Sequence, residues 1–360
     1  MIPQLSKTVI DNMKSNRADL RDRKIVLGAY PVKLFIEPTQ KCDLDCPMCD
    51  FSRRSDLKDM DMELFRKIEK ELFPYAGEVN FHLTGEATLA KNFNEMIKTS
   101  SKYTFIPKIF TNANRVSEET LRLFVELGFN VSVSIDAATK ELYEEVRTGS
   151  KLEYFIKNVK KLISISDQIK NERFNLRFSC TMGHHNVHEA PKLVELAHEL
   201  GVRDMMFGAM DLGAKSKRHL TMDTQKNISY LKKAKELADK YKIRFSCPKR
   251  IGGTIINDNH NWYDFELPID KFAPFQLEEH NPLEGDCGYP WIQTCIRSNG
   301  TVVSCCQAEH IVGDYRESNF WDIWNNDMYQ ELRKQKSFYN CLGKGCNLTI
   351  NSIWKGEKTR

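Results

Sequence analysis

The alternation of strand-like and helix-like segments between residues 32 and 210 constrains the fold of this chain most strongly. Six segments alternate apolar and polar residues with the period of a β-strand. Strands that are separated by helices form a parallel sheet with right-handed crossovers. Six such units are too few for a standard eight-stranded barrel, so an open partial barrel or a doubly wound sheet remains. The expected strands are 32–39, 79–86, 107–112, 130–136, 175–182 and 203–210.

The segments between these strands carry apolar residues at helical spacing. A further helix is expected at 5–24, before the first strand, and others at 222–241 and 318–335. Residues Asn299 and Gly300 predict the turn of a β-hairpin. The helices expected between the strands are 61–74, 90–102, 117–127, 139–163 and 187–200.

These elements predict an α/β chain with a second, smaller α+β domain at its carboxyl end. The expected parts are an N-terminal helical extension (1–30), a barrel-like domain (31–215), a linker helix and strand (216–250) and a C-terminal domain (251–360). Only about 30 residues precede the first strand, so we expect no separate domain there.

Several expected strands have one polar face. In the fourth, Ser132, Ser134 and Asp136 alternate with Val131 and Val133. If the apolar faces pack against the helices, the polar faces line an interior that accepts a large polar ligand.

The charge and hydropathy of the chain exclude other classes. The formal net charge is only +4, and basic residues are spread along the chain, which argues against a nucleic-acid partner. The amino terminus lacks the apolar run of a signal peptide. No window reaches the roughly 18 consecutive apolar residues of a membrane span. We therefore expect a cytoplasmic protein without a membrane partner.

The 11 cysteines fall mainly into two groups, which in a reducing compartment suggests metal binding or catalysis rather than disulfides. Cys42, Cys46 and Cys49 lie within eight residues, directly after the first expected strand. A structural zinc site usually has four ligands. Three thiolates that bind a [4Fe–4S] cluster leave one iron open to another ligand.

The spacing Cys42-x3-Cys46-x2-Cys49 resembles the signature of radical S-adenosylmethionine (radical SAM) enzymes. The segments 84–89, 111–114 and 132–149 fall where that family carries its other motifs. The resemblance covers about residues 30–250 and implies a partial (β/α)6 TIM-like barrel. It also implies that S-adenosylmethionine chelates the open iron and is cleaved to a 5′-deoxyadenosyl radical, which abstracts a substrate hydrogen atom. A flavodoxin- or ferredoxin-type protein would donate the electron.

The resemblance implies cofactor-binding residues outside the cysteine loop. Segment 84–86 stands where the family has Gly-Gly-Glu, and would meet the methionine amino group. Asn112 resembles a position near the ligand, Ser134 one that contacts a ribose or carboxylate, and Arg147 the arginine that pairs with the carboxylate. The implied cofactor-binding residues are Thr84, Gly85, Glu86, Asn112, Ser134 and Arg147.

The second cysteine group resembles the accessory domain called SPASM, or its shortened form Twitch. The resemblance rests on the Cys287-x12-Gly300-x4-Cys305 pattern, the hairpin and the helix that begins at "FWDIWNN". Six tail cysteines imply one auxiliary [4Fe–4S] cluster, although zinc suits four thiolates equally. Cys295 and Cys306 are alternative ligands or buried neighbours of the cluster. The implied ligands are Cys287, Cys305, Cys341 and Cys346.

These resemblances imply an oxidoreductase that acts on a small polar substrate, such as a sugar or aminocyclitol. We expect dehydrogenation of an alcohol, with the auxiliary cluster accepting the second electron. One alternative is a radical epimerase, in which Cys247 is the candidate hydrogen donor. Another is a peptide- or protein-modifying maturase whose tail domain binds the peptide, and a third is a metal-binding protein without catalysis.

Overall fold

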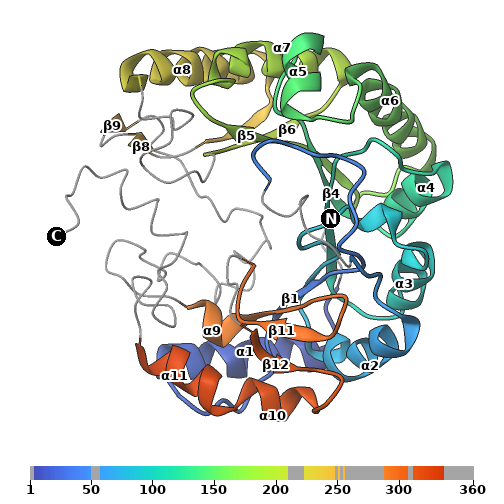
Figure 1. The fold of residues 1–360 in the computed structure, drawn as a ribbon, viewed down its shortest axis with the longest axis vertical. Helices are drawn as coiled ribbons and strands as arrows, with labels where there is room; N and C mark the ends of the chain where they lie inside the picture. The colour runs from blue at the N-terminus through green and yellow to red at the C-terminus, as the bar shows by residue number, and fades with distance from the viewer. Residues whose placement is uncertain are drawn as a thin grey trace. The chain divides into compact units, whose positions relative to one another are not determined.

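The computed structural model describes residues 4–49, 57–209, 223–247, 250–251, 254–255, 288–306 and 311–335. Figure 1 shows the helices and strands of the chain, coloured from blue at the N-terminus to red at the C-terminus. The chain divides into two compact units. Unit 1 comprises Met1–Lys41, Arg54–Ile109 and Glu266–Thr349. Unit 2 comprises Cys42–Arg53, Phe110–Phe265 and Ile350–Arg360. No helix in the described ranges is both long and apolar enough to cross a bilayer.

Unit 1 contains a mixed sheet with the strand order β12-β11-β10-β1-β2-β3. The first three strands of the chain are parallel, as predicted, and β10 adds a fourth parallel strand beside β1. The hairpin at Asn299-Gly300 is confirmed, because β10 and β11 pair in antiparallel fashion. The strands are β1 (Lys33–Ile36), β2 (Glu78–Asn80), β3 (Ile106–Thr111), β10 (Gln293–Ile296), β11 (Thr301–Val303) and β12 (Ile311–Asp314).

The helices of unit 1 begin where side chains cap the free backbone N–H groups. Ser6, Asp61 and Asn319 accept hydrogen bonds from backbone N–H groups in the first turns of α1, α2 and α10. The single helix expected at 318–335 is two helices, because Asn326 accepts from the backbone N–H of Tyr329 and starts a new one. The helices are α1 (Lys7–Arg21), α2 (Met62–Leu72), α3 (Phe93–Ser100), α9 (Tyr289–Ile292), α10 (Phe320–Trp324) and α11 (Asp327–Gln335).

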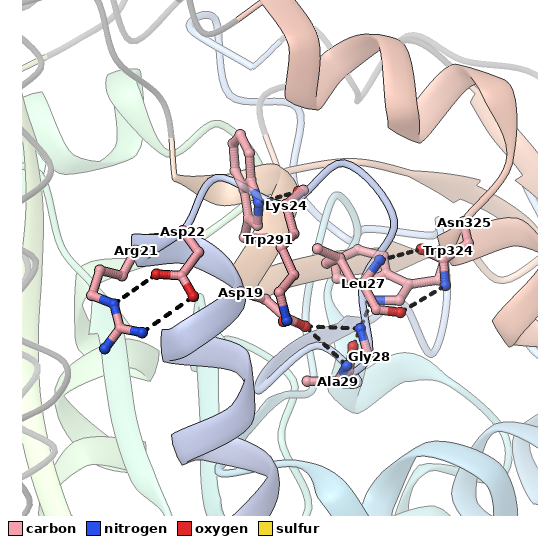
Figure 2. A network of polar contacts seen from close by, with 10 residues as sticks. All are labelled: Asp19, Arg21, Asp22, Lys24, Leu27, Gly28, Ala29, Trp291, Trp324 and Asn325. Atoms are coloured by element: carbon pink, nitrogen blue, oxygen red, sulfur yellow. Dashed lines mark hydrogen bonds and ion pairs between the residues drawn. The ribbon is translucent and has the colours of Figure 1, made fainter.

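A polar network joins α1 to the helices at the carboxyl end of unit 1 (Figure 2). The buried Asp19 carboxylate accepts hydrogen bonds from the backbone N–H groups of Gly28 and Ala29, and it pairs with the Lys24 ammonium at 2.7 Å. The indole Nε1 of Trp291 donates to the Lys24 carbonyl, and that of Trp324 donates to the Ala29 carbonyl. The N-terminal helix is therefore bonded to the C-terminal part of the same unit.

Unit 2 repeats the strand–helix pattern in the order β4-β5-β6-β7, with all four strands parallel. The expected strands 130–136, 175–182 and 203–210 correspond to β4 (Asn130–Ser134), β5 (Asn175–Met182) and β6 (Asp204–Ala209), and β7 (Arg244–Ser246) is the strand of the expected linker. The helices are α4 (Glu118–Glu126), α5 (Lys140–Val146), α6 (Leu152–Ile169), α7 (Ala190–Leu200) and α8 (Thr224–Tyr241). A short pair, β8 (Arg250–Ile251) and β9 (Thr254–Ile255), follows β7.

The helix expected at 139–163 is interrupted between α5 and α6. Gly149 lies at the interruption with a φ of +98°, a left-handed conformation that favours glycine. No apolar residue lies between Val146 and Leu152, so the sequence did contain a signal for the interruption, although the overall helical pattern of 139–163 obscured it. Its cause is a contact with the cysteine loop, which is described below.

The polar strand faces are largely buried and hydrogen bonded rather than open to solvent. In unit 1, Glu78 pairs with Lys33 at 3.3 Å and with Lys108 at 2.6 Å. In unit 2, the Asp204 carboxylate pairs with both Arg177, at 2.8 Å, and Arg244, at 2.7 Å. Buried charges require such partners because their desolvation is costly.

Candidate functional site

The three clustered cysteines lie in the loop that follows β1. Cys42 is exposed, Cys46 is buried, and Cys49 is half-buried and donates a backbone hydrogen bond to the Cys46 carbonyl at 2.9 Å. Among the described residues, no three Cys, His, Asp or Glu side chains already converge at metal-ligand spacing. The donors themselves are soft thiols, the ligand type that iron–sulfur clusters take. The donor set therefore fits such a cluster.

Asparagines of the segment 111–114 hold this loop in place. Asn112 Nδ2 donates to Asp43 Oδ1 at 2.8 Å, and Asn114 Nδ2 donates to Asp43 Oδ2 at 2.7 Å. The Asp43 side chain is only 6% exposed, and Asn112 Nδ2 lies 3.9 Å from Cys42 Sγ. The segment that was expected near the ligand thus fixes the residue next to the first cysteine.

Residues after α5 hold the loop from another direction. The backbone N–H of Asp45 donates to the Thr148 carbonyl at 2.9 Å. A Cβ atom on Gly149 would lie 3.1 Å from the Asp43 carbonyl oxygen. The expected helix is interrupted here because the chain passes directly against the cysteine loop.

Arg147 is part of a buried ion pair in the same unit. Its Nε lies 2.6 Å from Asp136 Oδ2, and Asp136 Oδ1 accepts from the backbone N–H of Thr181 at 2.6 Å. Burial opposes the charge of the guanidinium, but the Asp136 carboxylate outweighs this effect and raises the pKa of Arg147. Burial raises the pKa of the Cys46 thiol, and the nearby Arg147 charge partly opposes that rise.

The turn 84–86 in unit 1 lies directly against the backbone that leads into the cysteine loop. A Cβ atom on Gly85 would lie 2.5 Å from the Thr39 carbonyl oxygen and 2.6 Å from that of Lys41. The Glu86 N–H donates to the Lys41 carbonyl at 2.8 Å. Only glycine fits at position 85, which supports a role for this turn in positioning the segment.

Glu37 is a buried carboxylate that the sequence did not single out. It accepts a hydrogen bond from the Thr84 hydroxyl, and its other oxygen accepts from the backbone N–H of Ser298 at 3.1 Å. Thr84 replaces a glycine of the family pattern, and its hydroxyl meets this carboxylate. The only feature of the sequence that could have pointed to Glu37 was an acidic residue at the end of an apolar strand.

Two further predicted residues lie at carboxyl ends of strands in unit 2. Ser134 ends β4, is half-buried, and pairs in register with Ser179 of β5. Cys247 directly follows β7 and is fully buried. These positions agree with the edge at which parallel α/β sheets place their ligands.

The described thiols of the tail lie together in unit 1. Cys295 is fully buried and packs with Phe35 and Val303. Burial raises the pKa of the Cys295 thiol, and the neighbouring Cys306 and Cys305 raise it further. Cys305 is also buried. The other three predicted cluster ligands, Cys287, Cys341 and Cys346, lie outside the described residues.

Two family models match the chain. Residues 36–197 match the radical SAM superfamily, and residues 287–347 match SPASM, an iron–sulfur cluster-binding domain. Together with the thiol loop, these matches define a radical enzyme that contains iron–sulfur clusters. The chain belongs to the radical SAM superfamily and carries a SPASM domain. Its radical SAM domain uses a [4Fe–4S] cluster and S-adenosylmethionine, and its SPASM domain binds auxiliary iron–sulfur clusters.

Two curated relatives align with most of the chain. A tungsten-containing aldehyde ferredoxin oxidoreductase cofactor-modifying protein from Pyrococcus furiosus is 24% identical over 325 residues, which cover 83% of this chain and 82% of the relative. A PqqA peptide cyclase from Ruegeria pomeroyi is 21% identical over 302 residues, which cover 82% of this chain and 74% of the relative.

The fold is shared with a solved structure. SuiB from Streptococcus suis, in its complex with the precursor peptide SuiA, has a TM-score of 0.65 at 16% identity. The match covers 94% of this chain and 74% of SuiB. The predicted α/β fold class, with a small C-terminal domain, is confirmed.

Proposed function

We propose that this protein is a radical SAM oxidoreductase that oxidises an alcohol carbon of a small polar molecule to a carbonyl. The observation that carries the radical chemistry is the way Asn112, Asn114 and Thr148 hold the cysteine loop. The alignment with a cofactor-modifying protein over most of both chains supports a small molecule.

Each part of the site has a distinct role in this proposal. Cys42, Cys46 and Cys49 would hold the first cluster, and the turn 84–86, Asn112, Ser134 and Arg147 would bind S-adenosylmethionine. The buried Asp136 carboxylate orients the Arg147 guanidinium, and Glu37 fixes the Thr84 end of the turn. These buried contacts keep the binding groups in place before a ligand arrives, which lowers the cost of binding.

Oxidation of the alcohol carbon removes one hydrogen atom, one proton and one electron. When bound, the cofactors of the two domains supply a 5′-deoxyadenosyl radical that takes the hydrogen atom and an iron–sulfur acceptor that takes the electron. The proton passes to solvent. We propose that Cys287, Cys305, Cys341 and Cys346 hold the acceptor. Four protein ligands leave no open iron, and such a cluster suits electron transfer rather than substrate binding.

Peptide modification is the second candidate function, because a PqqA peptide cyclase aligns with 82% of the chain. In that case the tail domain would bind a peptide. Epimerisation is a variant of the first candidate, with the buried Cys247 as a hydrogen donor at the end of β7.

The test is turnover by the anaerobically reconstituted protein on a panel of sugars, aminocyclitols and peptides in deuterated buffer. We expect one carbonyl product per 5′-deoxyadenosine, from a small alcohol, in both the wild type and Cys247→Ala. An inverted alcohol that carries solvent deuterium, with no such product from Cys247→Ala, would establish epimerisation instead. Modification of peptides alone would establish the second candidate.

A further inference from the structure

One face of β10 carries a buried thiol between two polar side chains. Thr294, on the opposite face, shares a hydrogen bond with the Tyr329 hydroxyl at 2.9 Å. Residues alternate between faces along a strand, so Gln293 and Cys295 lie on the other side, and Arg297 continues this alternation just past the strand. Phe35 of the neighbouring strand packs on Cys295 from this side.

Both polar side chains on this face hold a buried donor without an acceptor. Gln293 is 1% exposed, and its Nε2 has no hydrogen-bond partner within the described ranges. The Nε of Arg297 is likewise buried without a partner in that part of the chain. Buried donors nearly always have acceptors, since an unmet donor costs its full desolvation energy. Two unmet donors on either side of one thiol indicate a shared acceptor.

Thiols and positive charges surround the same face. Cys295 pairs with Val303 across the hairpin, and the buried Cys305 follows two residues after the end of β11. On its other side, Gln293 pairs with Lys33 of β1. Lys33 Nζ lies 5.3 Å from the ring centroid of Phe35, the residue of β1 that pairs with Cys295. Glu78 is the carboxylate that pairs with Lys33.

We propose that Gln293 and Arg297 donate hydrogen bonds to sulfur atoms of the auxiliary iron–sulfur cluster, and that these donors and the Lys33 charge raise its reduction potential. Cluster sulfurs accept hydrogen bonds from N–H groups. Reduction adds negative charge to the cluster, so donors and cations stabilise the reduced state more than the oxidised state. A raised potential suits the electron acceptor that the proposed dehydrogenation needs, and only this consequence rests on that proposed function.

The potential can be measured without turnover. Full-length protein with Cys42, Cys46 and Cys49 replaced by alanine retains the auxiliary cluster alone. In this background we compare Gln293→Leu, Arg297→Met, Arg297→Lys and Lys33→Met by potentiometric titration followed by electron paramagnetic resonance. Arg316→Met is the matched control, because it removes an exposed positive charge from the same unit. Iron content is measured for every variant.

We expect Gln293→Leu and Arg297→Met each to lower the potential, with roughly a tenfold change in the reduction equilibrium for Arg297→Met, about 59 mV for one electron. Lys33→Met lowers it as well, Arg297→Lys lowers it less than Arg297→Met, and Arg316→Met leaves it unchanged. Unchanged potentials in Gln293→Leu and Arg297→Met at full iron content would overturn the proposal. Failure to find a carbonyl product would refute the proposed dehydrogenation but would leave the measured potentials unaffected.

A second measurement does not depend on the variants loading iron. Protein labelled with ¹⁵N-arginine and reduced at the auxiliary cluster should show ¹⁵N coupling in pulsed electron paramagnetic resonance, because Arg297 Nε lies against a cluster sulfur. The coupling should persist in Arg316→Met. Absence of arginine nitrogen coupling in full-length protein whose tail carries no substitution would contradict the proposed contact.

Discussion

Asp43 illustrates at the scale of a single residue what sequence reasoning can and cannot identify. The family resemblance predicted that Asn112 lies near the ligand, because the motif carries an equivalent position. It did not identify Asp43, whose carboxylate accepts hydrogen bonds from the side chains of Asn112 and Asn114. It also did not identify Glu37, whose carboxylate accepts a hydrogen bond from the Thr84 hydroxyl. From the sequence alone, an aspartate between two cysteines would be expected to be exposed to solvent, because charged residues usually are. Only the folded chain brings the donors within hydrogen-bond distance.

Removing one donor from Asp43 should loosen the cysteine loop. In Asn112→Ala the nearly buried carboxylate loses one of its two asparagine donors, at a cost of about 1–3 kcal/mol. We expect the variant to bind less iron at the first site after anaerobic reconstitution. Asn92→Ala is the matched control, because Asn92 makes no capping hydrogen bond on α3. Equal iron content in both variants would contradict this role of Asn112.

At the scale of elements, period and turn signals predicted the strands and most helices, but not the two interruptions. The helix expected at 139–163 is interrupted because Gly149 lies against Asp43, about one hundred residues earlier in the chain. The helix expected at 318–335 is interrupted because Asn326 caps a new helix. Apolar periodicity reports burial along a segment, and contacts between distant segments override it.

Comparing alanine variants of two glycines distinguishes the effect of backbone strain from the effect of contact with the cysteine loop. Gly149 and Gly201 have φ values of +98° and +81°, so alanine should destabilise either position by about 1 kcal/mol. A Cβ on Gly149 would meet the Asp43 carbonyl at 3.1 Å, whereas one on Gly201 would meet nothing within 4 Å. We expect iron loading to fall in Gly149→Ala only. The same loss in Gly201→Ala would attribute the effect to strain alone.

The strands β1, β2 and β3 are joined by Glu78 between Lys33 and Lys108. Burial opposes the charge of this carboxylate, but the two lysines outweigh it and lower its pKa from 4.5 to about 2. Because the pKa of Glu78 is lower in the folded protein, its ionisation stabilises the fold by about 3 kcal/mol. This stabilisation is complete above pH 4.5 and is lost as the pH falls towards 2.

Urea unfolding of the metal-free protein at several pH values checks this expectation. The free energy of unfolding of Glu78→Gln should lie below that of the wild type at pH 6, and the difference should shrink between pH 4.5 and 2. Glu95→Gln is the control, because Glu95 is exposed and pairs with Arg66 on the surface. If the difference in unfolding free energy between wild type and Glu78→Gln does not change with pH, ionisation of Glu78 is not the source of the stabilisation.

At the scale of the whole molecule, the order of motifs indicated the superfamily and the iron–sulfur tail, and both are confirmed. Two long-range features of unit 1 were not predictable from local patterns. The strand β10 pairs in parallel with β1, and the N-terminal helix is bonded through Asp19 and residues 24–29 to α9 and the C-terminal helices. Such pairings depend on segments about 260 residues apart, whose complementarity no single window records.

Cleavage of S-adenosylmethionine tests the central claim most directly. Anaerobically reconstituted wild type should bind about eight irons per chain, four for each of two clusters. With a strong reductant it should convert S-adenosylmethionine to 5′-deoxyadenosine and methionine, even slowly without substrate. Cys46→Ala should be inert, and the alanine variant of all three loop cysteines should retain about four irons. Fully loaded wild type that forms no 5′-deoxyadenosine would contradict the account.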